Sequence, residues 1–492
     1  MVRRSDASSP PLATARCSCQ SPGENKHEVC ASASAPSPLG LPITARPISS
    51  RIVNSPKPSQ LATSLFWRTF IRVFDRLNNV TILEVSITAS CTILATMCIL
   101  HFCVHGKTKP THNSDSPLTT SLQKKLDSTI AKLVSIFFRS VLVILGTVVL
   151  FYVVLPLGFF LFPSHAQHVF FLNFCTKFVK HSCSFKILVR AVGINYSDLR
   201  AHGITSPGRN FYIQGHFNED VAEPPILGVW HILPARYSDR FREKKIPTEE
   251  DVIEILSTTN DPVVVYYHGN SYDRTSKHRC QLYQTLSEQN FHVFSVDYRG
   301  FGDSTGLPTE GGVIRDALTV HQYVLEKAKG PKKIIVWGHS MGSGVAIAVS
   351  AFLCQLNTPP YCVVLESAFN NLRDAMTAHP YSIPYRQFPL FDFAIVRPLI
   401  RAGLVMASDE RIAKITCPIL MLHAADDLII PLRLGRLLYE ARCKNNPLVE
   451  FVEFEPHRKF GHNSIYRAVE LSTILKEFLA KCEKLRTVPA SS

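Results

Sequence analysis

A Gly-X-Ser-X-Gly motif is the strongest indication of chemistry in this chain. Residues 338–342, Gly-His-Ser-Met-Gly, follow the apolar run 334–337 and precede a stretch of small residues that suits a helix. At so tight a strand-to-helix turn, glycine on either side lets the serine hydroxyl stand above the sheet, and the helix N-terminus favours negative charge there. The motif predicts Ser340 as a nucleophile; a glycine-rich turn with an idle serine is the alternative.

A serine hydroxyl is a weak nucleophile, so Ser340 needs a histidine base that a carboxylate holds in place. Asp426 and Asp427 follow one later apolar run, and we favour Asp427 because it lies beyond the strand end, where the loop turns back over the sheet. His457 and His462 follow the last apolar run. We favour His462, which lies in the loop just before the final helix, after the acid in chain order.

The reaction would also need two backbone N–H groups to stabilise an oxyanion. The N–H of Met341, the residue after the nucleophile, is one candidate. The other is the N–H of Asn270 in His268-Gly269-Asn270, which follows the first apolar run of the catalytic region. An ordinary strand-end turn is the alternative interpretation of this tripeptide. None of this chemistry requires a metal or an organic cofactor.

The residues named above must be positioned by a sheet. Short runs rich in β-branched residues alternate with longer segments of helical period, and the runs are almost wholly apolar, as expected for parallel strands covered on both faces. This pattern predicts a doubly wound α/β sheet over residues 211–485, with a cap insertion at about 370–410. The apolar runs are 263–269, 292–300, 333–340, 362–367, 417–424 and 449–455.

Composition and charge narrow the class of protein. Of 492 residues, 46% are hydrophobic and 19% charged, which excludes a chain disordered throughout and a coiled coil. The net charge of +14 lies entirely in residues 1–209, with 22 Lys and Arg against 8 Asp and Glu, whereas residues 210–492 are neutral. A nucleic-acid partner is therefore not expected. The 14 cysteines form no Cys-X-X-Cys pair, which argues against a zinc ribbon.

The basic N-terminal region carries the predicted membrane anchor. Residues 140–162 contain no charge and are long enough to span a bilayer, so they predict a transmembrane helix. The more polar stretch 85–104, within a segment 80–139 that also holds a basic linker, is a candidate second span. Residues 1–79 are predicted to be a disordered basic tail and 163–210 a juxtamembrane linker.

The charges that flank the predicted helix indicate its orientation. More Lys and Arg residues precede it than follow it, which places its N-terminal side in the cytoplasm and the catalytic region in a lumen or outside the cell. Asn195-Tyr-Ser is a glycosylation acceptor consistent with that side. A second span would move the tail to the other side and need not move the catalytic region.

Several longer motifs resemble the membrane-bound lysophosphatidylserine and monoacylglycerol lipases of the abhydrolase-domain group. The resemblance runs from about residue 130 to 484 and leaves out residues 1–129. It places the family's nucleophile, acid and base on Ser340, Asp427 and His462. The motifs that carry it include YHGN, DYRGFGDS, WGHSMGSG, LESAFNN, HPYSIPYRQFPLFDF and LHAADD.

The resemblance implies an α/β-hydrolase fold and a single-pass protein of the endoplasmic reticulum membrane with a lumenal catalytic domain. Family substrates would be lysophosphatidylserine and monoacylglycerols, cleaved at a carboxylic ester. Four arginines of the cap are candidates for an anionic headgroup, or else ordinary surface or salt-bridged residues: Arg373, Arg386, Arg397 and Arg401. A serine peptidase and an acyl-protein thioesterase of the same fold are the rival functions, and a hydrolase-fold binding protein is disfavoured because every triad position is filled.

Overall fold

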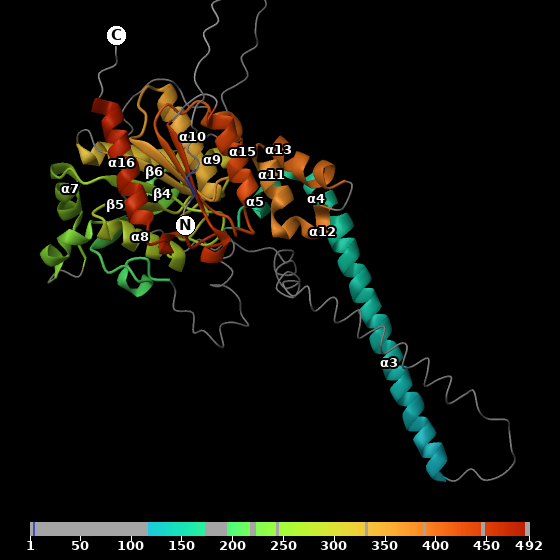
Figure 1. The fold of residues 1–492 in the computed structure, drawn as a ribbon. Coiled ribbons are helices and arrows are strands. Elements are labelled where there is room, and N and C mark those ends of the chain that lie inside the picture. Colours follow the sequence, from blue (N-terminus) through green and yellow to red (C-terminus); the bar gives the residue numbers. More distant parts are fainter. Residues whose placement is uncertain are drawn as a thin grey trace, which may run out of the picture. The chain divides into compact units, whose positions relative to one another are not determined.

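The computed structural model describes residues 3–4, 117–172, 194–216, 223–242, 246–329, 333–386, 390–443 and 448–487 (Figure 1). Apart from two residues, the predicted tail 1–79 lies outside this part of the chain, as does the candidate second span 85–104. The chain divides into two units, of which one contains residues 57–158 and the other contains residues 159–492 together with the N-terminal end. Each unit is described by itself below.

The described part of the smaller unit is one long helix. Helix α3 (Pro117–Val149) continues through a π-helical turn (Leu150–Val154) into α4 (Leu155–Leu161), of which the residues from Phe159 on belong to the larger unit. Residues 117–139, predicted as a linker, are therefore helical. Neither proline nor glycine interrupts that stretch after Pro117, so nothing in it ends a helix before the apolar residues begin.

The helix from Lys124 to Leu161 is long and apolar enough to cross a membrane, by length and composition. Its apolar part starts after Arg139 and contains the predicted span 140–162 except for its last residue. At about 1.5 Å per residue it covers the roughly 30 Å of a bilayer core. Leu142 and Val143 are 67% and 68% exposed, as expected for side chains that face lipid. The π-helical turn ends two residues before Pro156, whose ring and missing N–H disturb the preceding turn of helix.

The larger unit is built on the predicted parallel sheet. Six strands run parallel in the order β9-β8-β7-β6-β4-β5; β3 joins β5 antiparallel, β2 joins β3 antiparallel, and β1 (Arg3–Arg4) joins β9 antiparallel. The predicted fold class is confirmed. The strand bounds are β2 Gly208–Gln214, β3 Ile226–Ile232, β4 Val263–Tyr267, β5 His292–Val296, β6 Ile334–His339, β7 Cys362–Glu366, β8 Ile419–Ala424 and β9 Val449–Phe454.

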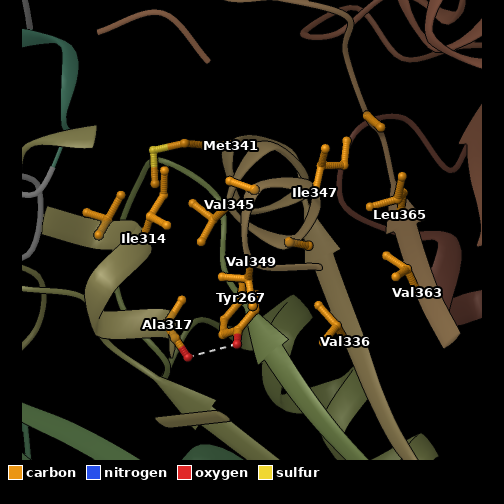
Figure 2. Packing of buried hydrophobic residues seen from close by; sticks show 14 of the residues in the cluster. Tyr267, Ile314, Ala317, Val336, Met341, Val345, Ile347, Val349, Val363 and Leu365 are labelled. Carbon is orange, nitrogen blue, oxygen red and sulfur yellow. Dashed lines mark hydrogen bonds between the residues drawn. The ribbon is translucent and has the colours of Figure 1, made fainter. Parts of the chain in front are cut away.

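Helices cover both faces of the sheet, and for that reason every residue of β4 to β8 is buried. On one face lie α9 (Glu310–Ala328), α10 (Met341–Gln355) and α15 (Leu432–Cys443), and on the other lie α8 (Lys277–Glu288) and α16 (Leu471–Thr487). Figure 2 shows side chains of α10 packed over those of β4 and β6, with Val345 and Val349 above Tyr267 and Val336. The shorter helix α7 spans Glu249–Thr258.

The cap lies between β7 and β8, where the sequence predicts it. It consists of short helices and turns, several of which carry exposed apolar side chains such as Ile383 and Phe393. Phe393 contacts Phe160 at the end of α4, with ring centroids 5.3 Å apart. The helices are α11 Leu372–Ala378, α12 Ile383–Arg386, a π-helical turn Asp392–Val396, α13 Arg397–Arg401 and α14 Ser408–Ile412.

The catalytic unit begins earlier in the chain than residue 211, the predicted boundary. α5 (Pro163–Phe170) follows the long helix, and the next residue, Phe171, is fully buried in the main core. Tyr196, Leu199 and Ile204 are also buried. The described parts of the predicted linker 163–210 therefore belong to the folded unit. Their apolar residues form one short cluster, 169–172, and otherwise single positions, and neither shows a helical or strand period.

Candidate active site

Ser340 occupies a sharp turn between strand β6 and helix α10. Its backbone has a positive φ, which is rare outside glycine, with φ 54° and ψ −123°. A Cβ atom on Gly338 would collide with the carbonyl oxygen of Gly342, and one on Gly342 would collide with the carbonyl oxygen of Tyr267. Only glycine therefore fits on either side of the serine, because the helix begins directly against the end of β4. The glycines of the sequence motif are therefore required by the close approach of α10 to the end of β4.

The structure brings Ser340, His462 and Asp427 together, although 122 residues separate the serine from the histidine. The Ser340 Oγ lies 2.9 Å from His462 Nε2, and His462 Nδ1 lies 2.7 Å from Asp427 Oδ2. The serine and the aspartate follow β6 and β8, and the histidine lies in the loop after β9. Parallel strands place these three loops at one edge of the sheet.

The Asp427 carboxylate is set up to remain charged. Burial by itself would raise its pKa, but the hydrogen bond and charge of His462 outweigh that effect, and the pKa is lowered. Its other oxygen accepts the backbone N–H groups of Ile429 and Ile430, both at 2.9 Å. An anionic acceptor at Nδ1 holds the proton on that nitrogen of His462, so that Nε2 presents a lone pair to the Ser340 hydroxyl.

The two alternatives from the sequence lie elsewhere. Both carboxylate oxygens of Asp426 accept the N–H of Gly461 at 3.0 Å, so Asp426 fastens the loop that carries His462. His457 is exposed on the surface, and its Nδ1 lies 3.1 Å from Glu455. Neither side chain reaches the serine directly.

His339 is a positioning group that the sequence analysis did not identify. Its Nε2–H donates to the backbone carbonyl of His462 at 2.8 Å. Burial holds the pKa of His339 well below its ordinary value, so the ring stays neutral beside the charged centre. The only available signal was its position as the variable residue before the serine, which carries no information about its contact 123 residues away.

The two predicted oxyanion donors flank the serine. Met341 is the first residue of α10, whose initial N–H groups lack partners within the helix. On the opposite side, a Cβ on Gly269 would lie only 3.2 Å from Ser340 Cβ, so the loop that carries Asn270 passes against the nucleophile. A carbonyl oxygen of substrate bound between this loop and the helix would meet N–H groups of both.

The cap arginines fall into two kinds. Arg373 and Arg397 both pair with Asp392, the latter at 2.7 Å. Arg386 and Arg401 are exposed. The structure thus brings two of the four together on one carboxylate, where their charge is partly neutralised.

The glycosylation candidate Asn195 is exposed in a turn in which its Oδ1 accepts the N–H of Ser197 at 3.1 Å.

Comparison with known proteins agrees with this architecture. Residues 258–384 match the Hydrolase_4 family, described as serine aminopeptidase S33. The lysophosphatidylserine lipase ABHD12 of Xenopus tropicalis is 41% identical over 56% of this chain and 69% of its own length, and that of Rattus norvegicus is 34% identical over 77% and 88%. Human ABHD12B is 35% identical over 55% and 72%.

The longer of these matches covers 77% of this chain and 88% of the relative, and the fold is that of an α/β hydrolase. The chain therefore belongs to the ABHD12 family of α/β hydrolases.

Proposed function

We propose that the protein is a membrane-anchored serine hydrolase that cleaves the carboxylic ester of lysophosphatidylserine and related lysophospholipids, and of monoacylglycerols. The observation that carries the proposal is the unbroken chain of hydrogen-bonding contacts from Asp427 through His462 to Ser340 at the turn before α10. Membership of the ABHD12 family supports the lipid substrate, since its relatives are named lysophosphatidylserine lipases.

In the proposed reaction, His462 Nε2 takes the hydroxyl proton as Ser340 Oγ attacks the acyl carbonyl carbon. Asp427 stabilises the imidazolium that forms. The N–H groups of Asn270 and Met341 stabilise the tetrahedral oxyanion. The imidazolium then gives its proton to the leaving glycerol oxygen, which leaves an acyl-serine, and water releases the fatty acid by the same route.

The surroundings of the site suit an amphiphilic substrate. The cap carries exposed apolar side chains, Ile383 and Phe393 among them, beside the arginines Arg386 and Arg401. Apolar side chains would accommodate an acyl chain, and an arginine would pair with the phosphate and carboxylate of an anionic headgroup. These arginines are proposed headgroup contacts, together with Arg373 and Arg397.

We further propose that the protein resides in the endoplasmic reticulum membrane with its catalytic unit in the lumen. The support is the run of basic residues before the apolar helix, including Lys124, Lys125 and Arg139, and the exposed acceptor Asn195 after it. A shift in mobility on glycosidase treatment, absent in Asn195→Gln, would support the lumenal side. An unmodified Asn195 in cells that glycosylate a control protein would count against it.

The decisive test compares wild type with Ser340→Ala in membranes. Substrates are a panel of lysophospholipids and monoacylglycerols, with a fluorophosphonate as an active-site label. We expect hydrolysis of lysophosphatidylserine and labelling to be lost together in the variant. Unchanged lipid hydrolysis in Ser340→Ala would overturn the proposal.

A serine peptidase is the second candidate, because the family matched by residues 258–384 is described as a serine aminopeptidase. Peptide amides with a free N-terminus belong in the same panel. Faster turnover of an amide than of any lipid ester would favour the peptidase over the lipase.

A further inference from the structure

We propose that the side chain of Asn270 is a positioning group that joins the oxyanion loop, residues 269–273, to the exit segment, residues 170–172, which begins at the last residue of α5. The inference rests on the proposed function and adds a structural part to its active site. Here the backbone N–H of Asn270 acts on the substrate, whereas its side chain acts on the protein.

The contacts of the Asn270 amide are paired. Its Nδ2 donates to the carbonyl of Phe170 at 2.7 Å, and its Oδ1 accepts the N–H of Leu172 at 3.2 Å. A carbonyl only accepts and an N–H only donates, so both bonds require an amide, with one donor and one acceptor at the same reach. A carboxylate lacks the donor and leucine lacks both functions, whereas a serine hydroxyl carries its donor and acceptor on one short-reaching oxygen and not on two separate atoms.

The same two segments are also joined through their backbones. Leu172 and Ser271 form an isolated parallel β-bridge. The oxyanion loop is therefore paired with the exit segment like a short strand, and the Asn270 amide extends that pairing by one residue. Because 98 residues separate Leu172 from Asn270, their hydrogen bond is a long-range tertiary contact and not part of a local turn.

The exit segment is a firm support for this tie. Phe171, between the two bonded residues, is fully buried, and its ring lies 6.4 Å from that of Phe301. The Phe301 ring in turn lies 5.1 Å from that of His268, at the start of the oxyanion loop. The segment is thus locked into the core beneath the loop that it holds.

The other side of the loop is held by a buried arginine. Arg279 is 2% exposed and donates to the carbonyls of Ser271 and Asp273, both at 2.7 Å. The carbonyl of Gly269 lies 2.7 Å from His268 Nδ1, which donates to it. Because C=O and N–H point in opposite directions within one planar peptide, fixing that carbonyl aims the N–H of Asn270 the opposite way.

Asn270 is therefore the residue at which both supports meet. The Gly269 carbonyl fixes the plane of its N–H, and its own side chain fixes its Cα against the exit segment. Truncating the Asn270 side chain keeps the backbone N–H that serves as the oxyanion donor, but that N–H is no longer held in one position. Loss of an entire donor costs about 10²–10³ in rate, so we expect Asn270→Ala to lower kcat by roughly 10-fold. The KM changes little because the donor acts in the transition state.

The chain offers a matched control in Gln284. Its side-chain Oε1 accepts the N–H groups of Thr205 and Ser206 at 2.9 and 3.3 Å, and so ties another distant segment to the same unit through an amide. We expect Gln284→Ala to change the thermal unfolding midpoint about as much as Asn270→Ala while leaving kcat within twofold of wild type.

Asn270→Asp provides a readout that a general loss of stability would not change. A carboxylate cannot donate to the Phe170 carbonyl and repels it, whereas a protonated carboxyl can donate. The ratio of variant to wild-type kcat/KM should therefore rise as pH falls. Taking the ratio removes the titration of the triad, which both proteins share.

The experiment uses full-length protein in membranes and measures monoacylglycerol hydrolysis and thermal unfolding for Asn270→Ala, Asn270→Asp, Gln284→Ala and Ser340→Ala. A lower kcat in both Asn270 variants but not in Gln284→Ala, with a pH-dependent ratio for Asn270→Asp, supports the inference. A kcat for Asn270→Ala within twofold of Gln284→Ala, or a flat ratio, overturns it. Hydrolysis that survives Ser340→Ala overturns the proposed function instead, so the two failures are distinct.

Discussion

Replacement of Asp427 by asparagine tests whether the carboxylate sets the proton on His462. In the native protein Asp427 Oδ1 accepts two backbone N–H groups, from Ile429 and Ile430 at 2.9 Å. An asparagine must keep its carbonyl oxygen there, since its NH₂ group would face two other donors. The NH₂ group is then forced into the position that faces His462 Nδ1.

The consequence is the opposite tautomer of the His462 imidazole. With a donor opposite, Nδ1 must present its lone pair, and the proton moves to Nε2, which lies 2.9 Å from Ser340 Oγ. A ring with its proton on Nε2 cannot accept the serine proton. In a comparable triad the same substitution lowers kcat by about 10⁴, or about 5.5 kcal/mol of transition-state stabilisation. We expect a loss of 10³-fold or more for Asp427→Asn, on the order of that precedent.

The assay is the initial rate of lysophosphatidylserine hydrolysis over a range of substrate concentrations, with fluorophosphonate labelling as a second measure of serine reactivity. Asp426→Asn is the matched control, because an asparagine there keeps an acceptor for the Gly461 N–H that Asp426 now binds at 3.0 Å. We expect that control to retain kcat within about threefold, the effect of a weakened surface hydrogen bond. More than a tenth of wild-type kcat in Asp427→Asn, or equal losses in both variants, would refute the reasoning.

Two further predictions concern the packing and titration around the site. Gly342→Ala should lose about 3 kcal/mol of unfolding free energy or fail to accumulate, because its Cβ would collide with the Tyr267 carbonyl, whereas Gly344→Ala, whose Cβ would lie 3.3 Å from Met406 Sδ, should lose about 1 kcal/mol or less. Chemical denaturation compares the two, and equal losses would contradict the close approach. Burial raises the pKa of Glu366 from 4.5 to about 7, so the folded protein keeps a proton that the unfolded chain releases between those values, and this residue's contribution to stability falls as pH rises through that window. The thermal unfolding midpoint of Glu366→Gln should therefore fall less than that of wild type between about pH 5 and about pH 8. An equal fall in both midpoints would show that Glu366 does not titrate in this way.

The fold could be predicted because its signals are local. A strand covered on both faces must be largely apolar along its length, so β4 to β8 each coincide with a run that is visible in the sequence. In β9 two partly exposed glutamates interrupt the apolar residues. The glycines around Ser340 also predict the turn from the sequence alone, because two backbones approach too closely there for any Cβ. The chain order of serine, acid and histidine then follows from where the strands end.

The boundary of the catalytic unit could not be predicted in this way. Phe171 and Ile204 are buried by partners far along the chain, and neither belongs to a periodic segment of its own. The apolar cluster 169–172 is only four residues long, and Ile204 lies among small and polar residues, so neither stretch by itself predicts a part of the folded unit. Burial there comes from the core formed by other elements and leaves no pattern in the neighbouring sequence.

The sequence by itself determined the parallel sheet, the turn that presents Ser340, and a short set of candidates for the acid and the base. Only the tertiary structure decided between adjacent residues: Asp427 faces His462, while Asp426 binds Gly461. It also showed that the Asn270 side chain reaches the segment after the apolar helix. The reason is that neighbouring side chains leave the backbone in different directions, and which direction meets a partner depends on residues that lie 35 to 100 positions away.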